Sequence, residues 1–540
     1  MNTHLLKKYF WLSLVGLLPL SFVACSDDDE LVREPEIINP SDKDSSSNEQ
    51  TYYTFSEAYI NQFCYDQMSF YYLWWKDINV GEWLLKDNPI NKVNSILYEE
   101  DEWSAAIENI KPYTDPSTTT YGTYGYEFIY LVDKDDTNKV LGVVVQMVYP
   151  GSPAEKAGLK RGSVILKLNG KDLQRTNEEY NNLRSSESLN LTVYNPETEV
   201  TEEIKMASTD MYLDPVLYEK IFDCGGKKVG YVFFNDYTFE CMDRLLEVAK
   251  SFKKEGVSEL VLDLRYNGGG YVITEEFLVS LLAPEENVKN GDLYQTAVYN
   301  DTEYSKLLKE YYGDDYANTY FKTKFEWNSN GKDYSYDTSD ANIGLNKIYA
   351  LVSQSTASAS EATLVSLMPF MDVEVIGVKT SGKHCAGIMF EAEDYYQDYE
   401  DYLADLKKNN LTKYNQFVDE FWKYYAGWKN YVGNWGLYVM VSTYADKDGN
   451  NPCRPDGIIP DLEIMDNPLS PYPLGDDRET LLREALTKAG YTNFTPMPED
   501  IESRSIVKPS LGEFIPSKTE GKRILLKPEI QMNKSSKLLK

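Results

Sequence analysis

Residues 258–283 read "SELVLDLRYNGGGYVITEEFLVSLLA", and this stretch decides the class of fold. It starts with an apolar run typical of a buried strand, continues through the glycine-rich turn at 268–270, and ends in an apolar helical segment. Two further apolar runs, "KIYALVS" (347–353) and "VEVIGV" (373–378), have the length and composition of buried strands. Strands that alternate with helices predict an α/β fold.

The neighbouring segments extend this pattern over residues 206–490. "KKVGYVFFNDY" (227–237) is strand-like, and "DDRETLLREALTKAG" (476–490) predicts a closing helix. Between 239 and 256 the spacing predicts an amphipathic helix that ends at Gly256. Its apolar face would carry Phe239, Met242, Leu246, Ala249 and Phe252.

A different pattern precedes this core. "GVVVQMVYPGSPAEKAGLKRGSVILKLNGKDL" (142–173) reads as a strand, a short helix, a second strand and an Asn-Gly turn, and it resembles a PDZ domain. PDZ domains bind a chain end at an exposed strand edge, with backbone N–H groups on the terminal carboxylate. The resemblance implies that "YGTYGYEF" (121–128) is the carboxylate-binding loop; the alternative is a purely structural β-domain. The loop residues are Gly122, Tyr124, Gly125 and Tyr126.

A second segment of the core raises the question of a reactive serine. Residues 352–368, "VSQSTASASEATLVSLM", place very small side chains between a β-branched run and a helical one. Ser358 and Glu361 have the spacing of a capping box, which by itself only starts a helix. Small neighbours would also leave room for a substrate beside a nucleophilic hydroxyl. Both roles are compatible if Ser360 is the cap.

Four segments, in this order, resemble the C-terminal processing peptidases, also called tail-specific serine proteases. They are "LDLRYNGGG" (262–270), "STASASE" (355–361), "KTSGKHCAG" (379–387) and "DGIIPDLEI" (456–464). The resemblance covers roughly 51–490. It implies a helical N-terminal region, a PDZ domain, a peptidase core of crotonase-like ββα units, and serine endopeptidase activity without a cofactor.

The resemblance also assigns roles residue by residue. Ser358 would be the nucleophile, and Lys383, 25 positions later, would be its base. An acyl oxyanion needs N–H donors. The N–H of Ala359, together with that of Gly268 or Gly269, would supply them.

The residue types agree with a serine–lysine pair. A serine needs a neighbouring base; of the two histidines, His4 lies in the expected signal segment and only His384 remains. Lysine serves as a base only if burial lowers its pKa. Lys379 is a rival lysine, and His384 is a rival base that would point to the opposite face of an extended segment. Many members of the family carry a glutamine four residues after the lysine, but here that position is Gly387, so the third group stays open.

The N-terminus resembles that of a bacterial lipoprotein. Two lysines precede the apolar run "YFWLSLVGLLPLSFVA" (9–24), which is too short to span a bilayer stably and predicts a signal peptide. Cys25 follows and would become the lipidated first residue, with Phe22 as a departure from the usual pattern. The acidic "SDDDE" after it is similar to the export signal of some surface lipoproteins. We therefore expect an outer-membrane lipoprotein of the cell envelope, and leave surface or periplasmic exposure open.

The expected organisation follows from these segments. It comprises a signal peptide (1–24), a lipid-anchored flexible tether (25–50), a helical domain (51–112), the PDZ domain (113–205), the peptidase core (206–490) and a loosely structured tail (491–540). Residues 286–345 and 391–432 exceed a minimal core. The second is interpreted either as a lid over the substrate or as a surface insertion.

Composition limits the partners. The formal charge of −32 over 540 residues repels phosphates, so we expect no nucleic-acid partner. Neither the cysteine spacing nor the histidine count predicts a metal site or a disulfide framework. The remaining partners are polypeptide substrates and, through Cys25, a membrane; the oligomeric state stays open. The competing hypotheses are a peptidase fold that only binds peptides, as a surface lipoprotein with weak or no activity, and a purely structural surface lipoprotein.

Overall fold

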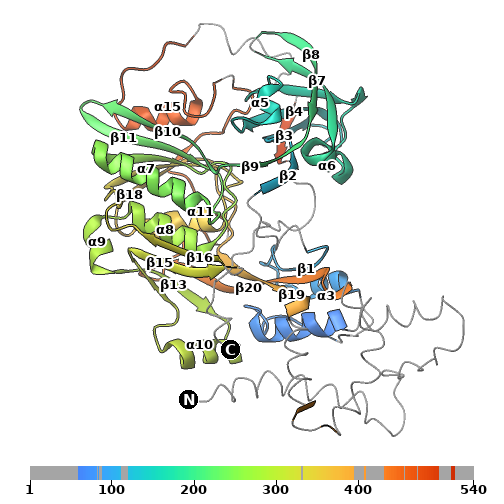
Figure 1. The fold of residues 1–540 in the computed structure, drawn as a ribbon, viewed down its shortest axis with the longest axis vertical. Coiled ribbons are helices and arrows are strands. Elements are labelled where there is room, and N and C mark those ends of the chain that lie inside the picture. Colours follow the sequence, from blue (N-terminus) through green and yellow to red (C-terminus); the bar gives the residue numbers. More distant parts are fainter. Residues whose placement is uncertain are drawn as a thin grey trace, which may run out of the picture.

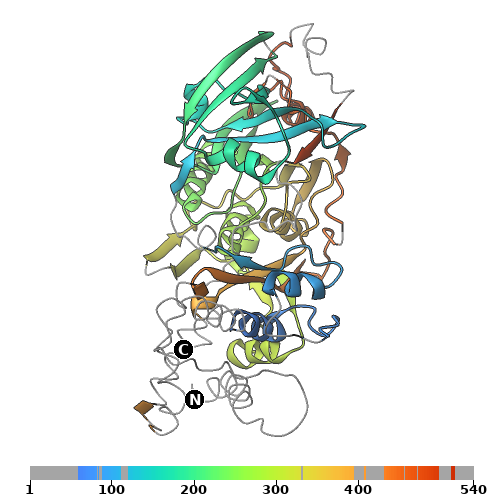
Figure 2. The same ribbon diagram turned by 90° about the vertical axis from the view of Figure 1, so that its right-hand side faces the viewer.

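The computed structural model describes most of the chain from residue 59 onward, and all structural statements below refer to that part. The described residues are 59–81, 83, 88–110, 119–196, 198–329, 332–394, 407–408, 411, 431–454, 456–470, 472–497 and 512–516. Figures 1 and 2 show a β-rich unit at one end, an α/β unit in the middle and a further sheet at the other end.

A 6-stranded sheet, here called the central sheet, has the order β10-β11-β12-β17-β18-β21. Its strands are β10 (Val216–Cys224), β11 (Lys227–Phe234), β12 (Val257–Asp263), β17 (Lys347–Val352), β18 (Asp372–Gly377) and β21 (Leu462–Glu463). The first pair is antiparallel and all later pairs are parallel. The buried strands predicted from the apolar runs are confirmed as β11, β12, β17 and β18.

The side chains of the central sheet alternate between two covered faces, because successive residues of a strand point in opposite directions. Leu260 and Leu262 pack into one cluster with α7, α8 and α11, whereas Val261 between them packs into a second cluster with α15. Figure 1 shows these helices in layers around the sheet. The helices are α7 (Cys241–Glu255), α8 (Val272–Leu282), α11 (Ala359–Leu367) and α15 (Thr480–Lys488). The α/β class is confirmed.

Helix α7 confirms the predicted amphipathic segment with one correction. Leu245 is buried in the core, whereas Leu246, which the spacing had placed on the buried face, is only half-buried. The helix ends at Gly256, whose φ of 74° is left-handed and favours glycine.

The β-rich unit is built on a 7-stranded sheet, here called the outer sheet, with the order β22-β3-β4-β5-β7-β8, and β6 pairs with β5. Its elements are β3 (Tyr126–Asp133), β4 (Val140–Val148), α5 (Pro153–Lys156), β5 (Val164–Leu168), β6 (Lys171–Asp172), α6 (Asn177–Ser185), β7 (Ser188–Asn195), β8 (Val200–Ala207) and β22 (Gly512–Pro516). Strands β2 (Thr119–Thr123) and β9 (Thr209–Tyr212) pair beside it. Strand β22 comes from the expected loose tail and pairs antiparallel with β3, so part of that tail is ordered.

The third unit is a 5-stranded sheet, here called the lower sheet, with the order β1-β20-β13-β14 and β19 paired to β20. Its strands are β1 (Ala105–Glu108), β13 (Leu293–Tyr299), β14 (Asn318–Tyr320), β19 (Cys385–Glu391) and β20 (Trp435–Asp446). A helix over 59–71 and α3 (Pro89–Ile96) pack with β19 and β20 in one cluster. The N-terminal segment therefore contributes a strand to the lower sheet and shares a hydrophobic core with β19 and β20.

The described residues of 286–345 form helices and strands, and two of these strands belong to the lower sheet. Besides β13 and β14 they include the hairpin β15 (Lys324–Ser329) and β16 (Lys332–Asp337), and the helices α9 (Glu285–Asn290) and α10 (Glu303–Tyr312). Most of 391–432 lies outside the described residues, so its predicted role as lid or surface insertion stays a prediction. Across the described segments, no helix combines the length and the apolar run that a membrane crossing requires.

Candidate active site

Ser358 lies at the junction between β17 and α11, in a backbone conformation that side chains rarely adopt. Its φ is 56° and its ψ is −119°, and it is 2% exposed. A non-glycine residue held there costs of order 1–3 kcal/mol, and such strain clusters at functional sites. Upstream, the Thr356 hydroxyl donates to the Leu264 carbonyl at 2.8 Å and fixes the turn to the end of β12.

The helix start differs from the expectation in one detail. Ser358 itself is the N-cap of α11, and its N–H donates to the Glu361 carboxylate at 2.9 Å. Ser360, predicted as the cap, lies inside the helix and donates to the Asn267 carbonyl at 3.1 Å. The assignment of Ser360 as cap is therefore wrong. The cap is Ser358, the same serine that the resemblance gives as the candidate nucleophile.

The glycine-rich turn packs directly on the Ser358 segment. Gly269 has a φ of 97°, and a Cβ there would lie 2.8 Å from both the Ala357 oxygen and the Ser358 Cβ. The Asn267 carbonyl also accepts from the Ala357 N–H at 3.1 Å. Only a glycine backbone fits this close contact, which explains the glycine at position 269.

The predicted oxyanion donors differ in availability. The Gly269 N–H already donates to Asn267 Oδ1 at 2.8 Å. Within the described chain, neither the Gly268 N–H nor the Ala359 N–H has an intramolecular acceptor. Ala359 is the first residue of α11, where the helix dipole favours negative charge. Gly268 and Ala359 are thus the two predicted donors that remain available.

The Glu361 carboxylate connects the serine segment to the lysine segment. One oxygen accepts from the Ser358 N–H at 2.9 Å; the other accepts from the Gly382 N–H at 2.7 Å and from the Thr380 hydroxyl at 2.5 Å. Glu361 is fully buried, and burial raises the pKa of its carboxyl. The residue before Lys383 is thereby held to the backbone of Ser358 through a single side chain.

Lys383 is 1% exposed, whereas its rival Lys379 is exposed. The Lys383 Nζ donates to the Tyr438 hydroxyl at 3.2 Å, and the Lys383 carbonyl accepts from the Tyr444 hydroxyl at 3.1 Å. Both tyrosines belong to β20, so the lower sheet holds the lysine from one side while α11 holds its backbone from the other. The Lys383 side chain is therefore enclosed by protein and not by water.

His384 faces the N-terminal segment. Its Nδ1 lies 3.1 Å from the Gly382 carbonyl, its ring meets Trp103 edge-on, and its Nε2 lies 3.9 Å from Glu100. Burial lowers the pKa of His384 and favours the neutral ring. The His384 imidazole is therefore buried and packs against Trp103 of the N-terminal segment.

The fourth predicted segment, 456–464, supports the lysine turn. A Cβ at Gly457 would lie 2.3 Å from the Thr380 carbonyl oxygen, and the Ile458 N–H donates to the Thr380 hydroxyl at 2.7 Å. The Asp461 carboxylate accepts from the Val375 N–H at 2.8 Å. The structure thus brings all four segments of the resemblance together around Ser358 and Thr380.

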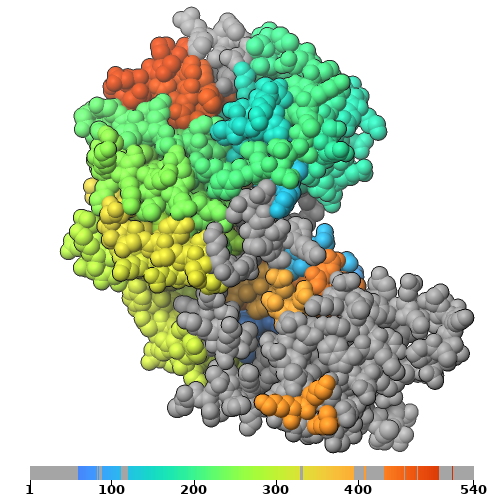
Figure 3. Space-filling view, in the orientation of Figure 1, coloured from blue at the N-terminus to red at the C-terminus, as the bar shows by residue number. Residues whose placement is uncertain are grey.

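A cavity of about 640 Å³ opens beside this cluster. Ser358 and Ala359 line it together with Gln295 and Ala297 of β13 and with residues of β19, β20 and α8. The hairpin β15–β16 forms another wall, where Trp327 and Tyr334 stack at 4.8 Å. The hairpin belongs to the yellow surface in Figure 3. The volume is in the range of ligand pockets and accommodates several side chains of a polypeptide.

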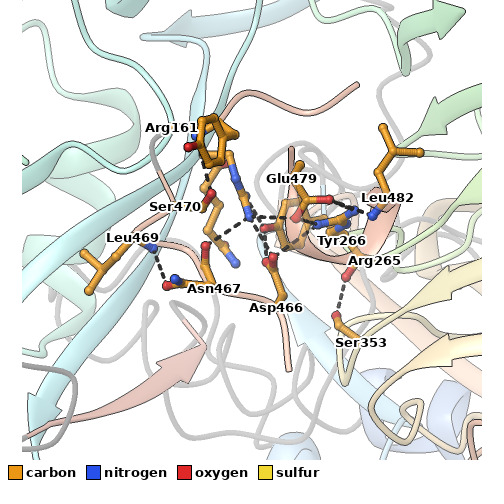
Figure 4. A network of polar contacts seen from close by, with 12 residues as sticks. Arg161, Arg265, Tyr266, Ser353, Asp466, Asn467, Leu469, Ser470, Glu479 and Leu482 are labelled. Atoms are coloured by element: carbon orange, nitrogen blue, oxygen red, sulfur yellow. Dashed lines mark hydrogen bonds and ion pairs between the residues drawn. The ribbon is translucent and has the colours of Figure 1, made fainter. Parts of the chain in front are cut away.

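Figure 4 shows a buried ionic cluster that sequence reasoning did not assign. Arg265 pairs with Asp263 at 2.8 Å, Glu479 at 2.7 Å and Asp466 at 3.1 Å. Arg161, on the turn before β5, pairs with Asp466 at 2.7 Å. The sequence signal was the Asp and Arg within "LDLRYNGGG"; two further partners of Arg265, Asp466 and Glu479, lie 201 and 214 positions away. The cluster joins the outer sheet to the core.

The predicted carboxylate-binding loop is partly engaged by the chain itself. The Gly122 N–H donates to Asp210 at 2.8 Å, and the Gly125 N–H donates to the Thr123 hydroxyl at 3.1 Å. The hydroxyls of Tyr124 and Tyr126 donate to carbonyls at the end of α6, those of Ser186 and Leu183. The two tyrosines are buried, so they support the loop rather than line its surface.

Comparisons with known proteins agree with the four segments. Residues 228–464 match the profile of peptidase family S41, and residues 144–194 match that of the PDZ domain. A carboxyl-terminal-processing protease of Picosynechococcus is 27% identical over 47% of this chain, which spans only 53% of that relative's length. A carboxyl-terminal-processing protease of Synechocystis is 21% identical over 70% of this chain and 77% of its own length.

A solved structure agrees with this fold. An S41 protease from Bacteroides fragilis shares 22% identity with this chain, covers 79% of it and 96% of its own length, and superposes with a TM-score of 0.56. The outer sheet with α5 and α6 thus holds the segment that matches the PDZ profile, and the central sheet with its helices has the fold of that protease.

Proposed function

Because the chain belongs to peptidase family S41, with its core at 228–464 and a PDZ domain at 144–194, we propose that it is a serine endopeptidase with a Ser358/Lys383 dyad. One observation carries the proposal. Glu361 accepts from the Ser358 N–H and from the Gly382 N–H, which fixes the strained serine and the buried lysine segment in one frame at the cavity. A helix cap alone does not require a buried lysine beside it.

The proposed chemistry follows from these groups. The neutral Lys383 amine takes the proton of the Ser358 hydroxyl as its oxygen attacks the substrate carbonyl. The N–H groups of Gly268 and Ala359 hold the oxyanion. The Lys383 ammonium then gives its proton to the leaving amine, which leaves an acyl-enzyme on Ser358. Water, deprotonated by Lys383, hydrolyses this ester and restores the serine.

A fluorophosphonate probe tests the nucleophile. The wild-type protein is expected to become covalently labelled at Ser358, identified by peptide mass mapping, and Ser358→Ala is expected to remain unlabelled. Ser355, which is exposed three positions upstream, provides the matched control, and Ser355→Ala should label like wild type. Absence of labelling in correctly folded wild type would favour the competing function, a peptidase fold that only binds peptides.

The substrates we propose are unfolded or exported polypeptides, delivered by the PDZ domain. A chain end that adds to the edge of β3 would meet the segment already there, because β22 pairs with residues 129–133 of that strand. Phe514 of β22 packs against Leu131 and Val144. The chain's own strand therefore competes with a substrate for the PDZ edge.

Truncation after residue 511 is expected to raise the affinity for a peptide with a free carboxyl end on the order of 10-fold, since it removes an intramolecular competitor. Fluorescence anisotropy with a labelled peptide measures the Kd. A truncation after residue 519, which keeps β22, is the matched control and should bind like the full chain. Equal affinity of all three proteins would show that peptides do not use this edge.

We further propose that the protein is an outer-membrane lipoprotein of the cell envelope anchored through Cys25. The apolar run 9–24, Cys25 and the acidic "SDDDE" support this. Residues 1–58 lie outside the described structure. Each acyl chain would contribute about 0.8 kcal/mol of membrane-binding free energy per buried CH₂, so two or more chains would anchor the protein stably.

Cys25→Ala is therefore expected to move essentially all of the protein out of the membrane fraction or to leave it with its signal attached. Fractionation, palmitate labelling and the mass of the mature chain measure this. Protease treatment of intact cells then distinguishes surface exposure, where the protein is digested, from a periplasmic location. Wild-type protein recovered wholly in the soluble fraction would contradict the anchor.

A further inference from the structure

We propose that the Tyr438 hydroxyl is the group that positions the Lys383 amine, an inference that rests on the dyad proposed above. The two side chains meet directly: Lys383 Nζ donates to the Tyr438 hydroxyl at 3.2 Å and lies 5.4 Å from the centre of its ring. Both residues are 1% exposed, so water does not compete for this contact.

The Tyr438 ring occupies the space beside position 387. A Cβ on Gly387 would lie 2.7 Å from Tyr438 Cζ and 2.3 Å from Met440 Cε. The pairing of β19 with β20 is irregular between Ala386 and Gly387. A side chain at 387 and the tyrosine cannot share this space. The polar group beside the lysine therefore comes from β20 and not from β19.

The backbone that carries Tyr438 is held on both sides. Its register partners are Ala105 of β1 and Met389 of β19, so β20 is an interior strand at this point. The neighbouring Met440 N–H also donates to the Ser104 hydroxyl at 3.0 Å. The Tyr438 hydroxyl is therefore held in a fixed place, where it can orient the flexible lysine side chain. The N-terminal segment helps to hold β20 through β1 and Ser104.

The orientation of the Lys383 amine matters for the proposed reaction, because its lone pair has to point at the Ser358 hydroxyl to accept the proton. A lysine side chain has four rotatable bonds, and an acceptor that fixes one N–H restricts the remaining rotation. Charged or titratable groups near Lys383 include Tyr444 of β20, His384 beside it, and Glu361 of α11, which acts through the Gly382 N–H. The amine itself donates to the Tyr438 hydroxyl.

Removal of this hydroxyl has two predictable consequences. The amine loses its orientation, so the maximal rate falls while KM stays unchanged, because Tyr438 is not among the residues that line the cavity. The ammonium form also loses an acceptor, which disfavours the charged state. The midpoint of the pH–rate profile should therefore move to lower pH, a change that a packing defect would not produce.

The test compares Tyr438→Phe with wild type and with Tyr294→Phe. Tyr294 is a fully buried tyrosine of β13, the strand next to β20, and it does not line the cavity. The rate of fluorophosphonate labelling and the turnover of a peptide are measured from acidic to alkaline pH. For Tyr438→Phe we expect a plateau lowered on the order of 10-fold, a midpoint at lower pH and an unchanged KM. Tyr294→Phe should retain the wild-type profile.

Three results would count against the inference, and they are distinguishable. A wild-type plateau and midpoint in Tyr438→Phe would overturn it while leaving the dyad intact. A lowered plateau with an unshifted midpoint and a reduced Tm would show that the tyrosine only supports packing. Failure of wild type itself to label would refute the Ser358/Lys383 proposal, and the role of Tyr438 with it.

Discussion

Ser358→Ala and Lys383→Ala are each expected to lower peptide-bond cleavage by at least about 10³-fold, and the double variant should be hardly worse than either. The effects do not add, because nucleophile and base act in the same step. Ser358 lines the cavity in a strained backbone conformation. Lys383 is buried and follows Gly382, whose N–H donates to the same Glu361 carboxylate as the Ser358 N–H. Hydrolysis of an unfolded protein or a quenched fluorescent peptide measures the loss.

The chain offers matched controls for this experiment. Lys379→Ala changes an exposed lysine four positions before Lys383 and should leave the rate unchanged. His384→Ala should keep most of the activity, because the imidazole packs toward Trp103 and Glu100. If His384→Ala were inactive while Lys383→Ala retained the wild-type rate, the base would be the histidine and the assignment of Lys383 would be wrong.

Arg265→Ala is expected to lower the free energy of unfolding by about 3–5 kcal/mol. The guanidinium is fully buried between the carboxylates of Asp263, Glu479 and Asp466, and its removal leaves buried negative charges without this counter-charge. Denaturant titration followed by tryptophan fluorescence measures the change. Activity should fall as well, since Arg265 lies on the short segment between β12 and the glycine-rich turn that packs on Ser358.

Arg478→Ala is the control for that prediction. Arg478 pairs with Asp476 at 2.6 Å, but its side chain is 27% exposed, and such pairs contribute about 0–1 kcal/mol. Equal destabilisation by Arg265→Ala and Arg478→Ala would contradict the argument from burial.

The same cluster predicts how wild-type stability depends on pH. Burial by itself would raise the pKa values of Asp466 and Glu479, but Arg161 and Arg265 outweigh it and leave both below their usual values. Groups with depressed pKa values stabilise the fold above their unfolded pKa, about 4, and this contribution is lost as pH falls further. Asp263 acts in the opposite direction, because burial raises its pKa. Without Arg265, the loss of stability on acidification should be smaller.

The sequence alone determined the α/β class, the PDZ pattern and the segments that meet at the site. Buried strands are recognisable as apolar runs, and glycines are typical of places where two backbone segments pack closely. The segment "LDLRYNGGG" therefore predicted both the end of a strand and a close backbone contact. The spacing of Ser358 and Glu361 identified the start of α11, because capping is local along the chain. It left open whether Ser358 or Ser360 is the cap, and the structure shows that the cap is Ser358.

Only the tertiary structure decided which groups surround those segments. The Arg161–Asp466 pair and the Tyr438–Lys383 contact join residues far apart in sequence, and their register depends on how sheets and helices pack. Glu361 was visible as a cap residue, but its contact with Gly382 required α11 to lie against the turn after β18. Likewise, the strand character of 512–516 depends on an open edge at β3 rather than on its own composition. Local sequence patterns predict secondary structure and burial, because these depend on neighbouring residues. Contacts between residues far apart in the sequence depend on how all the helices and sheets pack together.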